Sequence, residues 1–273
     1  TTHVINEDKD IVIGVIRLPK IANFTDIDPF EYEEDVGVEM IGINDEIGEV
    51  DAIIIPGTRN STDDLKAIKE SGLGDKIIEK AAEIPVVGIC GGMQILGNYI
   101  FDDDKKESSV GTIKGLELLD ITSKFDRNDK IVTQSEFTVP DYDRLVGLAG
   151  EIFKNIVGEK VSGYEIHEGT TELNTSYLVA PLFNVNKGNG NNDLGLYDGA
   201  CSNNVFGTYL HGIFHNYNFR REFLNYLREK KGLEKKYGED PYETKKDYSL
   251  NRIAEIVEEN LDMEIIDKLL FNK

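Results

Sequence analysis

Residues 85–97 read PVVGICGGMQILG, and this stretch is the strongest indication of the fold. The apolar run from Pro85 to Ile89 is typical of a short strand that is buried on both faces. The glycine pair Gly91 and Gly92 separates it from a helical pattern, which predicts a sharp strand-to-helix turn with Cys90 at its apex. The glycines are expected to adopt the strained dihedral angles of that turn and to leave room for a substrate.

A thiol at the start of a helix is a ready nucleophile, because the backbone N–H groups and the helix dipole favour its thiolate. The alternative is a buried structural cysteine, which is the usual state of a lone cysteine in a folded protein. The strand before Cys90 and the glycine pair after it favour the nucleophile.

Apolar runs at 11–16, 51–55 and 205–210 extend the strand pattern, and helical patterns at 63–70 and 75–82 lie between two of the strands. Ser61 or Thr62 is placed to cap the first of these helices. Strands that alternate with helices predict a three-layer α/β domain with a mostly parallel sheet flanked by helices. Chemistry in such sheets collects at the carboxyl ends of the strands, where Gly57 and Cys90 both fall.

The remaining segments carry weaker patterns. Residues 101–160 are polar with short alternating stretches, which indicates a β-rich segment packed on the main sheet, and residues 187–193 have the composition of a loop. The tail from Ser249 has apolar residues at helical spacing, which predicts an amphipathic helix capped by Ser249.

The composition limits the function. The chain has 273 residues and a formal net charge of −21, which disfavours nucleic acid and anionic membranes as partners. It contains no apolar run of the roughly 20 residues that a bilayer requires. Residues 1–10 are polar and are expected to be a leader or linker rather than a signal peptide. The two cysteines, Cys90 and Cys201, are expected to be free thiols in a reducing cytoplasm.

A nucleophilic cysteine needs a base to accept its proton and an acid to protonate the leaving group. The chain has four histidines, His3, His167, His211 and His215. His211 follows a predicted strand and precedes a glycine, so it is our candidate for this partner, with a structural hydrogen-bonding role as the alternative. His211 and His215 are four residues apart, but no glutamate or cysteine completes a zinc spacing, so no metal is expected.

Acyl transfer also needs hydrogen-bond donors for an oxyanion. The N–H of Gly91, directly after the nucleophile, is one candidate, and the N–H of Gly57 at the neighbouring strand end is the second. Gly57 is equally compatible with a plain turn. The chain has no Gly-x-x-x-x-Gly-Lys-Ser/Thr motif, so it does not supply a phosphate loop of that kind.

Five segments, in order along the chain, resemble class I (triad-type) glutamine amidotransferases of the cobyric acid synthase (CobQ/CbiP-like) branch. The nucleophile motif is shared by many amidotransferases, whereas the Asn-Phe-Thr-Asp and Tyr-Glu-Ile-His segments are typical of this branch. The segments are VIRLPKIANFTD at 15–26, PGTRNSTDDL at 56–65, GICGGMQILG at 88–97, SGYEIHEG at 162–169 and GTYLHGIF at 207–214.

The resemblance implies a class I amidotransferase (flavodoxin-like) fold and a role for each matching residue. Cys90 would be the nucleophile and His211 its acid/base partner. Gly57 and Gly91 would supply oxyanion N–H groups, and Gln94 would lie beside the bound glutamine.

One position departs from the pattern. Many relatives place a glutamate two residues after the histidine as the third catalytic member, and here that position is Ile213. We therefore expect a Cys–His dyad, with Glu165 as a possible orienting carboxylate.

Family members carry an ATP-binding amidoligase domain ahead of this one. The resemblance therefore implies a leader at 1–10, a glutamine amidotransferase domain at 11–231 and a helical extension at 232–273 packed on it. The chain would hydrolyse L-glutamine without a cofactor of its own, and ATP and Mg would bind the N-terminal synthetase domain or subunit. That partner would use the ammonia to amidate corrinoid carboxylates in cobalamin biosynthesis. The alternatives are a cysteine hydrolase on the same fold and a non-catalytic regulatory module.

Overall fold

The computed structural model describes residues 9–106, 108, 110–125, 130–141, 145–174, 178–192 and 194–271. The chain divides into two compact units, one that ends at Lys236 and one that begins at Tyr237. Most of the predicted leader at 1–10, including His3, lies outside the described residues, as does Asp193 of the predicted loop.

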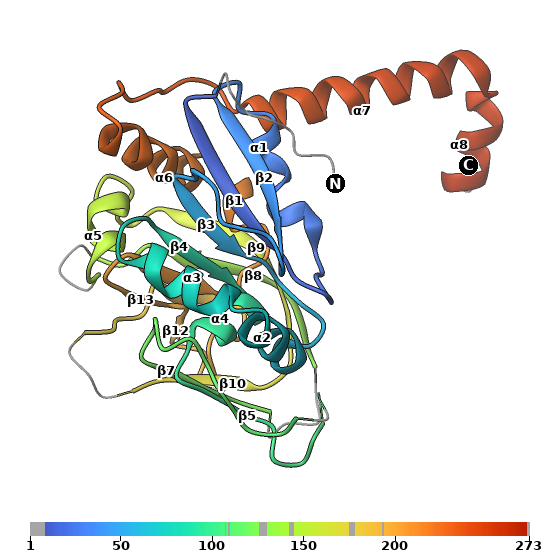
Figure 1. Cartoon of the computed structure of the whole chain (residues 1–273). Helices are drawn as coiled ribbons and strands as arrows, with labels where there is room; N and C mark the ends of the chain where they lie inside the picture. The colour runs from blue at the N-terminus through green and yellow to red at the C-terminus, as the bar shows by residue number, and fades with distance from the viewer. Residues whose placement is uncertain are drawn as a thin grey trace. The chain divides into compact units, whose positions relative to one another are not determined.

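A six-stranded sheet forms the centre of the first unit, in the order β13-β14-β4-β3-β1-β2 (Figure 1). Neighbouring strands pair in parallel, except that β13 and β14 pair antiparallel. The strands are β1 (Ile11–Arg17), β2 (Val36–Gly42), β3 (Ala52–Ile55), β4 (Val86–Ile89), β13 (Ala200–Ser202) and β14 (Val205–Thr208). The predicted mostly parallel sheet is therefore confirmed, together with the strands expected at 11–16, 51–55, 85–90 and 205–210.

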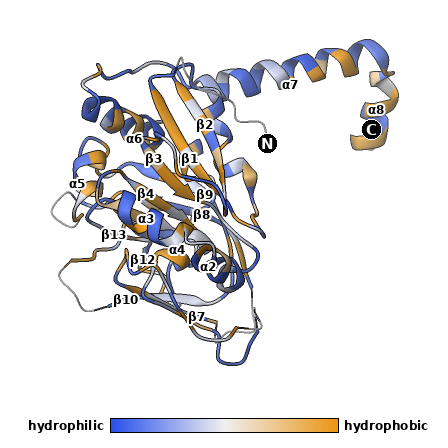
Figure 2. Ribbon diagram, in the orientation of Figure 1, coloured by the Kyte–Doolittle hydropathy of each residue, from blue (hydrophilic) through white to orange (hydrophobic). Residues whose placement is uncertain are grey.

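The central strands are apolar along their whole length because helices cover the sheet. Every residue of β3, β4 and β14 is buried, and Figure 2 shows the hydrophobic colouring concentrated in β1 and β3. The helix α6 packs on β1, and α4 packs on β3, β4 and β14. The helices of this unit are α1 (Asp28–Glu31), α2 (Ser61–Glu70), α3 (Leu73–Ala81), α4 (Gly91–Leu96), α5 (Leu148–Phe153) and α6 (Tyr217–Lys230).

The cap of α2 differs from the expectation. Asn60 is the N-cap residue, and its side chain accepts a hydrogen bond from the N–H of Asp63 at 2.8 Å. Ser61 and Thr62, which were expected to cap, lie inside the first turn. Asparagine caps a helix as well as serine does, and Asn60 comes directly before the two residues that the sequence suggested.

Two four-stranded sheets confirm the predicted β-rich segment, ordered β10-β7-β5-β6 and β12-β11-β8-β9. The helix α5 interrupts this segment and packs on β13 and β14. The strands are β5 (Tyr99–Phe101), β6 (Ile113–Lys114), β7 (Ile121–Lys124), β8 (Ile131–Thr138), β9 (Lys160–His167), β10 (Thr170–Leu173), β11 (Phe183–Lys187) and β12 (Tyr197–Asp198).

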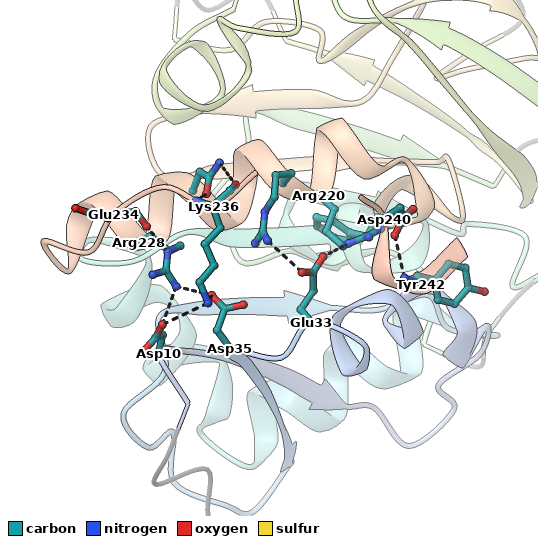
Figure 3. A network of polar contacts seen from close by, with 12 residues as sticks. Asp10, Glu33, Asp35, Arg220, Arg228, Glu234, Lys236, Asp240 and Tyr242 are labelled. Atoms are coloured by element: carbon teal, nitrogen blue, oxygen red, sulfur yellow. Dashed lines mark hydrogen bonds and ion pairs between the residues drawn. The ribbon is translucent and has the colours of Figure 1, made fainter. Parts of the chain in front are cut away.

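A buried ionic cluster ties α6 to the chain between α1 and β2, as Figure 3 shows. The Nε of Arg220 donates to Glu33 at 2.8 Å, and the Nη1 of Arg221 donates to the same carboxylate at 3.1 Å. Arg220 also donates to the carbonyl of Phe214 at 2.7 Å. Breaking a buried pair by removing one partner costs about 3–5 kcal/mol. The cluster therefore holds the N-terminal segment against the residues that follow His211.

The second unit consists of α7 (Pro241–Asn260) and α8 (Met263–Phe271). The predicted cap at Ser249 is wrong, because Ser249 lies inside α7 and donates to the carbonyl of Lys245 at 2.9 Å. The helix begins at Pro241, and the side chain of Asp240 caps it. A proline in the first turn after an aspartate cap is a strong start signal. The packing of residues 232–273 on the amidotransferase domain stays a prediction.

Candidate active site

Cys90 lies at the turn between β4 and α4, and it carries the strain of this turn itself. Its φ of 53° and ψ of −113° are unusual for a residue with a side chain. The expectation that the glycines take the strained angles is therefore wrong, since neither Gly91 nor Gly92 has a positive φ. Their role is space: a Cβ on Gly92 would lie 1.9 Å from the carbonyl oxygen of Ile55. Strain of this kind costs about 1–3 kcal/mol and concentrates at active sites.

The Cys90 side chain is buried, with 6% of the residue exposed, yet it lines a pocket. The pocket joins the nucleophile turn to the loop after β3 and the end of β9. It is lined by the Cys90 thiol, the Gln94 amide, the imidazole of His167, and both cationic and anionic side chains. The lining residues are Thr58, Arg59, Cys90, Gly91, Gln94, Lys130, Ile166, His167 and Glu168. Within the described residues, no group of three or more histidine, cysteine, aspartate or glutamate side chains is arranged to hold a metal ion.

His211 is fully buried and is held on three sides. Its Nδ1 lies 2.7 Å from Oδ2 of Asp26, whose other oxygen accepts a hydrogen bond from the N–H of Gly212 at 2.7 Å. Its Nε2 lies 3.2 Å from Nδ2 of Asn23. The ring stacks on Tyr164, with centroids 5.0 Å apart and planes at 17°. A carboxylate oxygen can only accept, so Nδ1 carries a proton and Nε2 is the nitrogen left for chemistry.

The electrostatics couple His211 to Cys90. Burial alone lowers the pKa of His211, but the negative charge of Cys90 and hydrogen bonds from the ring to Asp26 and Cys90 raise it to about 10. The Cys90 sulfur also contacts the carbonyl oxygen of Ile166 at 3.7 Å. The structure thus brings together the two residues that the sequence places far apart.

Glu165, the sequence-based candidate for the orienting carboxylate, points elsewhere. Its oxygens accept from the hydroxyl of Ser135 and from the N–H groups of Asn189 and Gly190, the latter two at 2.8 and 2.6 Å. It also lies 3.5 Å from Nε2 of His167. Side chains alternate along β9, so Glu165 and His167 share one face of the strand while the stacking residue Tyr164 is on the other.

Asp26 is therefore the carboxylate that contacts His211, and sequence reasoning missed it. The two residues are 185 positions apart, and Asp26 lies in a short 3-10 helix, Phe24–Asp26. The available signal was the Asn-Phe-Thr-Asp segment, which supported the resemblance without receiving a role. Asn23 belongs to the same segment, and its positive φ of 57° is a conformation that asparagine tolerates. Ile213, the position expected for the third member, is fully buried.

The other candidates also surround Cys90 and His211. Gly57 lies against the imidazole, since a Cβ there would be 2.8 Å from Cε1 of His211. Gly91 approaches Thr58, and Gln94 lines the pocket with 3% of its surface exposed. Their assignment to oxyanion and substrate binding stays a prediction. His215 lies outside the pocket lining, with its Nε2 2.6 Å from the carbonyl oxygen of Thr25.

Comparison with known proteins gives three findings. Residues 12–219 match the model of the CobB/CobQ-like glutamine amidotransferase domain. The chain is 51% identical over 262 residues to a probable cobyric acid synthase of Methanothermobacter thermautotrophicus, covering 96% of this chain and 50% of the relative. It is 38% identical over 262 residues to a cobyric acid synthase of Clostridium botulinum, covering 95% of this chain and 50% of the relative.

Solved structures support the fold. The structure of PurLQS from Thermotoga maritima matches with a TM-score of 0.56 and 21% identity, over 80% of this chain and 99% of that chain. A crystal structure of a glutamine amidotransferase matches with a TM-score of 0.52 and 16% identity, over 81% and 99%. These neighbours confirm the three-layer α/β architecture that the sequence predicts. The chain spans about half the length of the two relatives named above.

Proposed function

Because the chain belongs to the CobB/CobQ-like glutamine amidotransferase family, we propose that it hydrolyses glutamine and supplies ammonia to an ATP-dependent synthetase. The observation that carries the proposal is the buried Cys90–His211–Asp26 arrangement beside an accessible pocket. A strained nucleophile turn, a histidine with a raised pKa and an orienting carboxylate are the parts that amide hydrolysis through a thioester requires.

The reaction begins when the Cys90 sulfur attacks the carboxamide carbon of glutamine. The carbonyl oxygen becomes an oxyanion, and the N–H groups of Gly57 and Gly91 donate to it. His211 gives its Nε2 proton to the departing nitrogen, so ammonia leaves and a glutamyl thioester remains. Throughout, Asp26 accepts from Nδ1 and keeps Nε2 directed at the reacting atoms.

Water then resolves the thioester. Nε2 of His211, now without its proton, accepts a proton from the attacking water. The carbon–sulfur bond breaks, glutamate leaves, and the sulfur returns to its starting state beside the imidazolium. No cofactor enters these steps. Tyr164 stacks on one face of the imidazole.

The whole enzyme that we propose is a cobyric acid synthase. The matched relatives are named cobyric acid synthase and are about twice as long as this chain. The other half would bind ATP and Mg, activate corrinoid carboxylates and capture the ammonia. Both cysteines are free in the structure, which is compatible with a cytoplasmic enzyme. Within the described residues, no helix is long and apolar enough to cross a membrane.

A diazo-ketone analogue of glutamine tests the proposal. The analogue should alkylate Cys90 and leave Cys201 unmodified, because Cys201 is fully buried and burial raises its pKa to about 11. Mass spectrometry of the digested protein reads both sites, and excess glutamine should protect Cys90. Labelling that glutamine does not prevent would favour a cysteine hydrolase with another substrate. Absence of labelling with the synthetase half present would favour a non-catalytic module.

Gly57→Ala tests the space beside the imidazole. The new methyl group would lie 2.8 Å from Cε1 of His211. The imidazole cannot move away easily, because its Nδ1 is hydrogen-bonded to Asp26. We expect kcat for glutamate release to fall by about 10²-fold, since a 1 Å misplacement of a catalytic group has effects of this size. Gly48→Ala is the matched control, because its Cβ would have no neighbour closer than 3.5 Å. Equal activity in both variants would contradict the tight approach of Gly57 to His211.

A further inference from the structure

A chain of buried hydroxyl groups connects the Gln94 side chain to the sheet β10-β7-β5-β6. Nε2 of Gln94 lies 3.0 Å from the hydroxyl of Tyr209, which lies 2.6 Å from Oγ1 of Thr171. Oγ1 of Thr171 lies 2.7 Å from the hydroxyl of Ser123. Thr171 and Ser123 are direct cross-strand partners on β10 and β7, so the sheet fixes the far end of the chain. None of the three hydroxyl residues has a role in the chemistry described above.

The direction of every hydrogen bond in this chain follows from one contact. Nε2 of Gln94 also lies 3.5 Å from the main-chain carbonyl oxygen of Glu168. That oxygen can only accept, so the NH₂ side of the amide must face it. The same NH₂ group then donates to Tyr209, whose own proton must go to Thr171, and Thr171 in turn donates to Ser123. The hydroxyl chain thus has a single consistent orientation.

The amide oxygen of Gln94 is the part left for a ligand. Both N–H bonds are committed to Tyr209 and Glu168, and the side chain lines the pocket that contains Cys90. Gln94 and Cys90 are four residues apart across the first turn of α4, which places them on one face. A group that reaches the Cys90 sulfur therefore meets a hydrogen-bond acceptor at Gln94.

We propose that Tyr209, Thr171 and Ser123 are positioning residues that hold the Gln94 oxygen toward the pocket and thereby select a carboxamide over a carboxylate. The inference rests on the proposed function, because it takes glutamine as the ligand. The carboxamide of glutamine has N–H groups to donate to Gln94, whereas ionised glutamate has only acceptor oxygens there. The Gln94 amide, fixed in this orientation, favours binding of glutamine and assists release of glutamate.

Tyr209→Phe should weaken this selection without removing packing. The variant keeps the ring that stacks on His167, with centroids 3.8 Å apart, and loses only the hydroxyl. Only the longer contact with the Glu168 carbonyl oxygen, at 3.5 Å, then opposes a turn of the Gln94 amide, so its NH₂ group can enter the pocket and donate to a carboxylate. We expect the dissociation constant of glutamate, divided by that of glutamine, to fall by about 10-fold. This is the size of effect expected when glutamine loses a hydrogen bond to the Gln94 oxygen and glutamate no longer places an acceptor against an acceptor.

Calorimetric titration of each ligand into the Cys90→Ala protein, with and without the second substitution, measures this ratio without turnover. Thr171→Val should lower the ratio in the same direction. The double variant should have the same ratio as Tyr209→Phe alone, because both substitutions interrupt the same series of hydrogen bonds. Tyr226→Phe on α6, outside the pocket lining, is the matched control and should leave the ratio unchanged.

The titrations distinguish a failure of the proposed function from a failure of the positioning role. If the Cys90→Ala protein with the synthetase half present binds no glutamine, the proposed function fails. If it binds glutamine but Tyr209→Phe weakens both ligands equally, or if the two substitutions add, the hydroxyls are structural and the inference is overturned. If Tyr209→Phe does not fold, Thr171→Val and Ser123→Ala carry the same comparison.

Discussion

Cys90→Ala should abolish glutamate release, with a fall of at least about 10³-fold, because no other group in the pocket can form the thioester. The synthetase half should be untouched by this change. Amide synthesis by the whole enzyme should therefore persist when ammonium replaces glutamine as the nitrogen source. The measurement compares product formation with each nitrogen source, in the wild type and in the variant.

Cys201→Ala is the matched control for a lost thiol. Cys201 is fully buried on β13, and its side chain lies outside the pocket lining. This variant should keep glutamine-dependent synthesis. If Cys90→Ala also loses synthesis from ammonium, the assignment of Cys90 to glutamine hydrolysis alone is wrong.

Asp26→Asn is expected to have the second-largest effect. An asparagine of the same shape can donate from its NH₂ group to Nδ1 of His211. The neutral imidazole then carries its proton on Nε2, so Nε2 can no longer accept a proton at Cys90. We expect kcat to fall by about 10²-fold or more. Glu165→Gln is the informative comparison, since Glu165 contacts His167 and not His211. A larger loss in Glu165→Gln than in Asp26→Asn would contradict the assignment of Asp26.

The pH dependence of stability gives an independent test. The pKa of His211 is about 10 in the folded protein, against a usual value of about 6.5 in an unfolded chain. A raised pKa stabilises the fold fully below about pH 6.5, and this contribution disappears as the pH rises through about 10. Asp26→Asn removes one cause of the raised pKa, so the wild type should lose more stability than the variant between pH 6.5 and pH 10. Urea unfolding at both pH values measures the difference, and parallel losses would contradict the coupling.

Local patterns were sufficient for most of the fold. A parallel strand buried on both faces needs a continuous apolar run, and the four such runs that the sequence shows became β1, β3, β4 and β14. Helix starts were less certain. Asn60 and Asp240 compete with neighbouring polar residues as caps, and the choice depends on where the chain enters from the preceding strand or loop.

The strand-to-helix turn at Cys90 was also predictable, since a strand, a cysteine and two glycines lie within one short segment. Its strained angles were assigned to the wrong residues, because a turn of this kind depends on how closely α4 approaches β3. Gly92 is required by the carbonyl of Ile55, a contact between segments that are separate in the sequence.

The chain's order of apolar and polar residues was enough to predict a parallel sheet, a strand-to-helix turn at Cys90 and a candidate histidine. The partner of that histidine required the folded chain. Asp26 reaches His211 across 185 positions, through a segment that the Glu33–Arg220 pair holds in place. Short-range patterns in the sequence indicate which secondary structure a segment adopts. Hydrogen bonds between distant side chains depend on how the segments pack, and no local pattern encodes that packing.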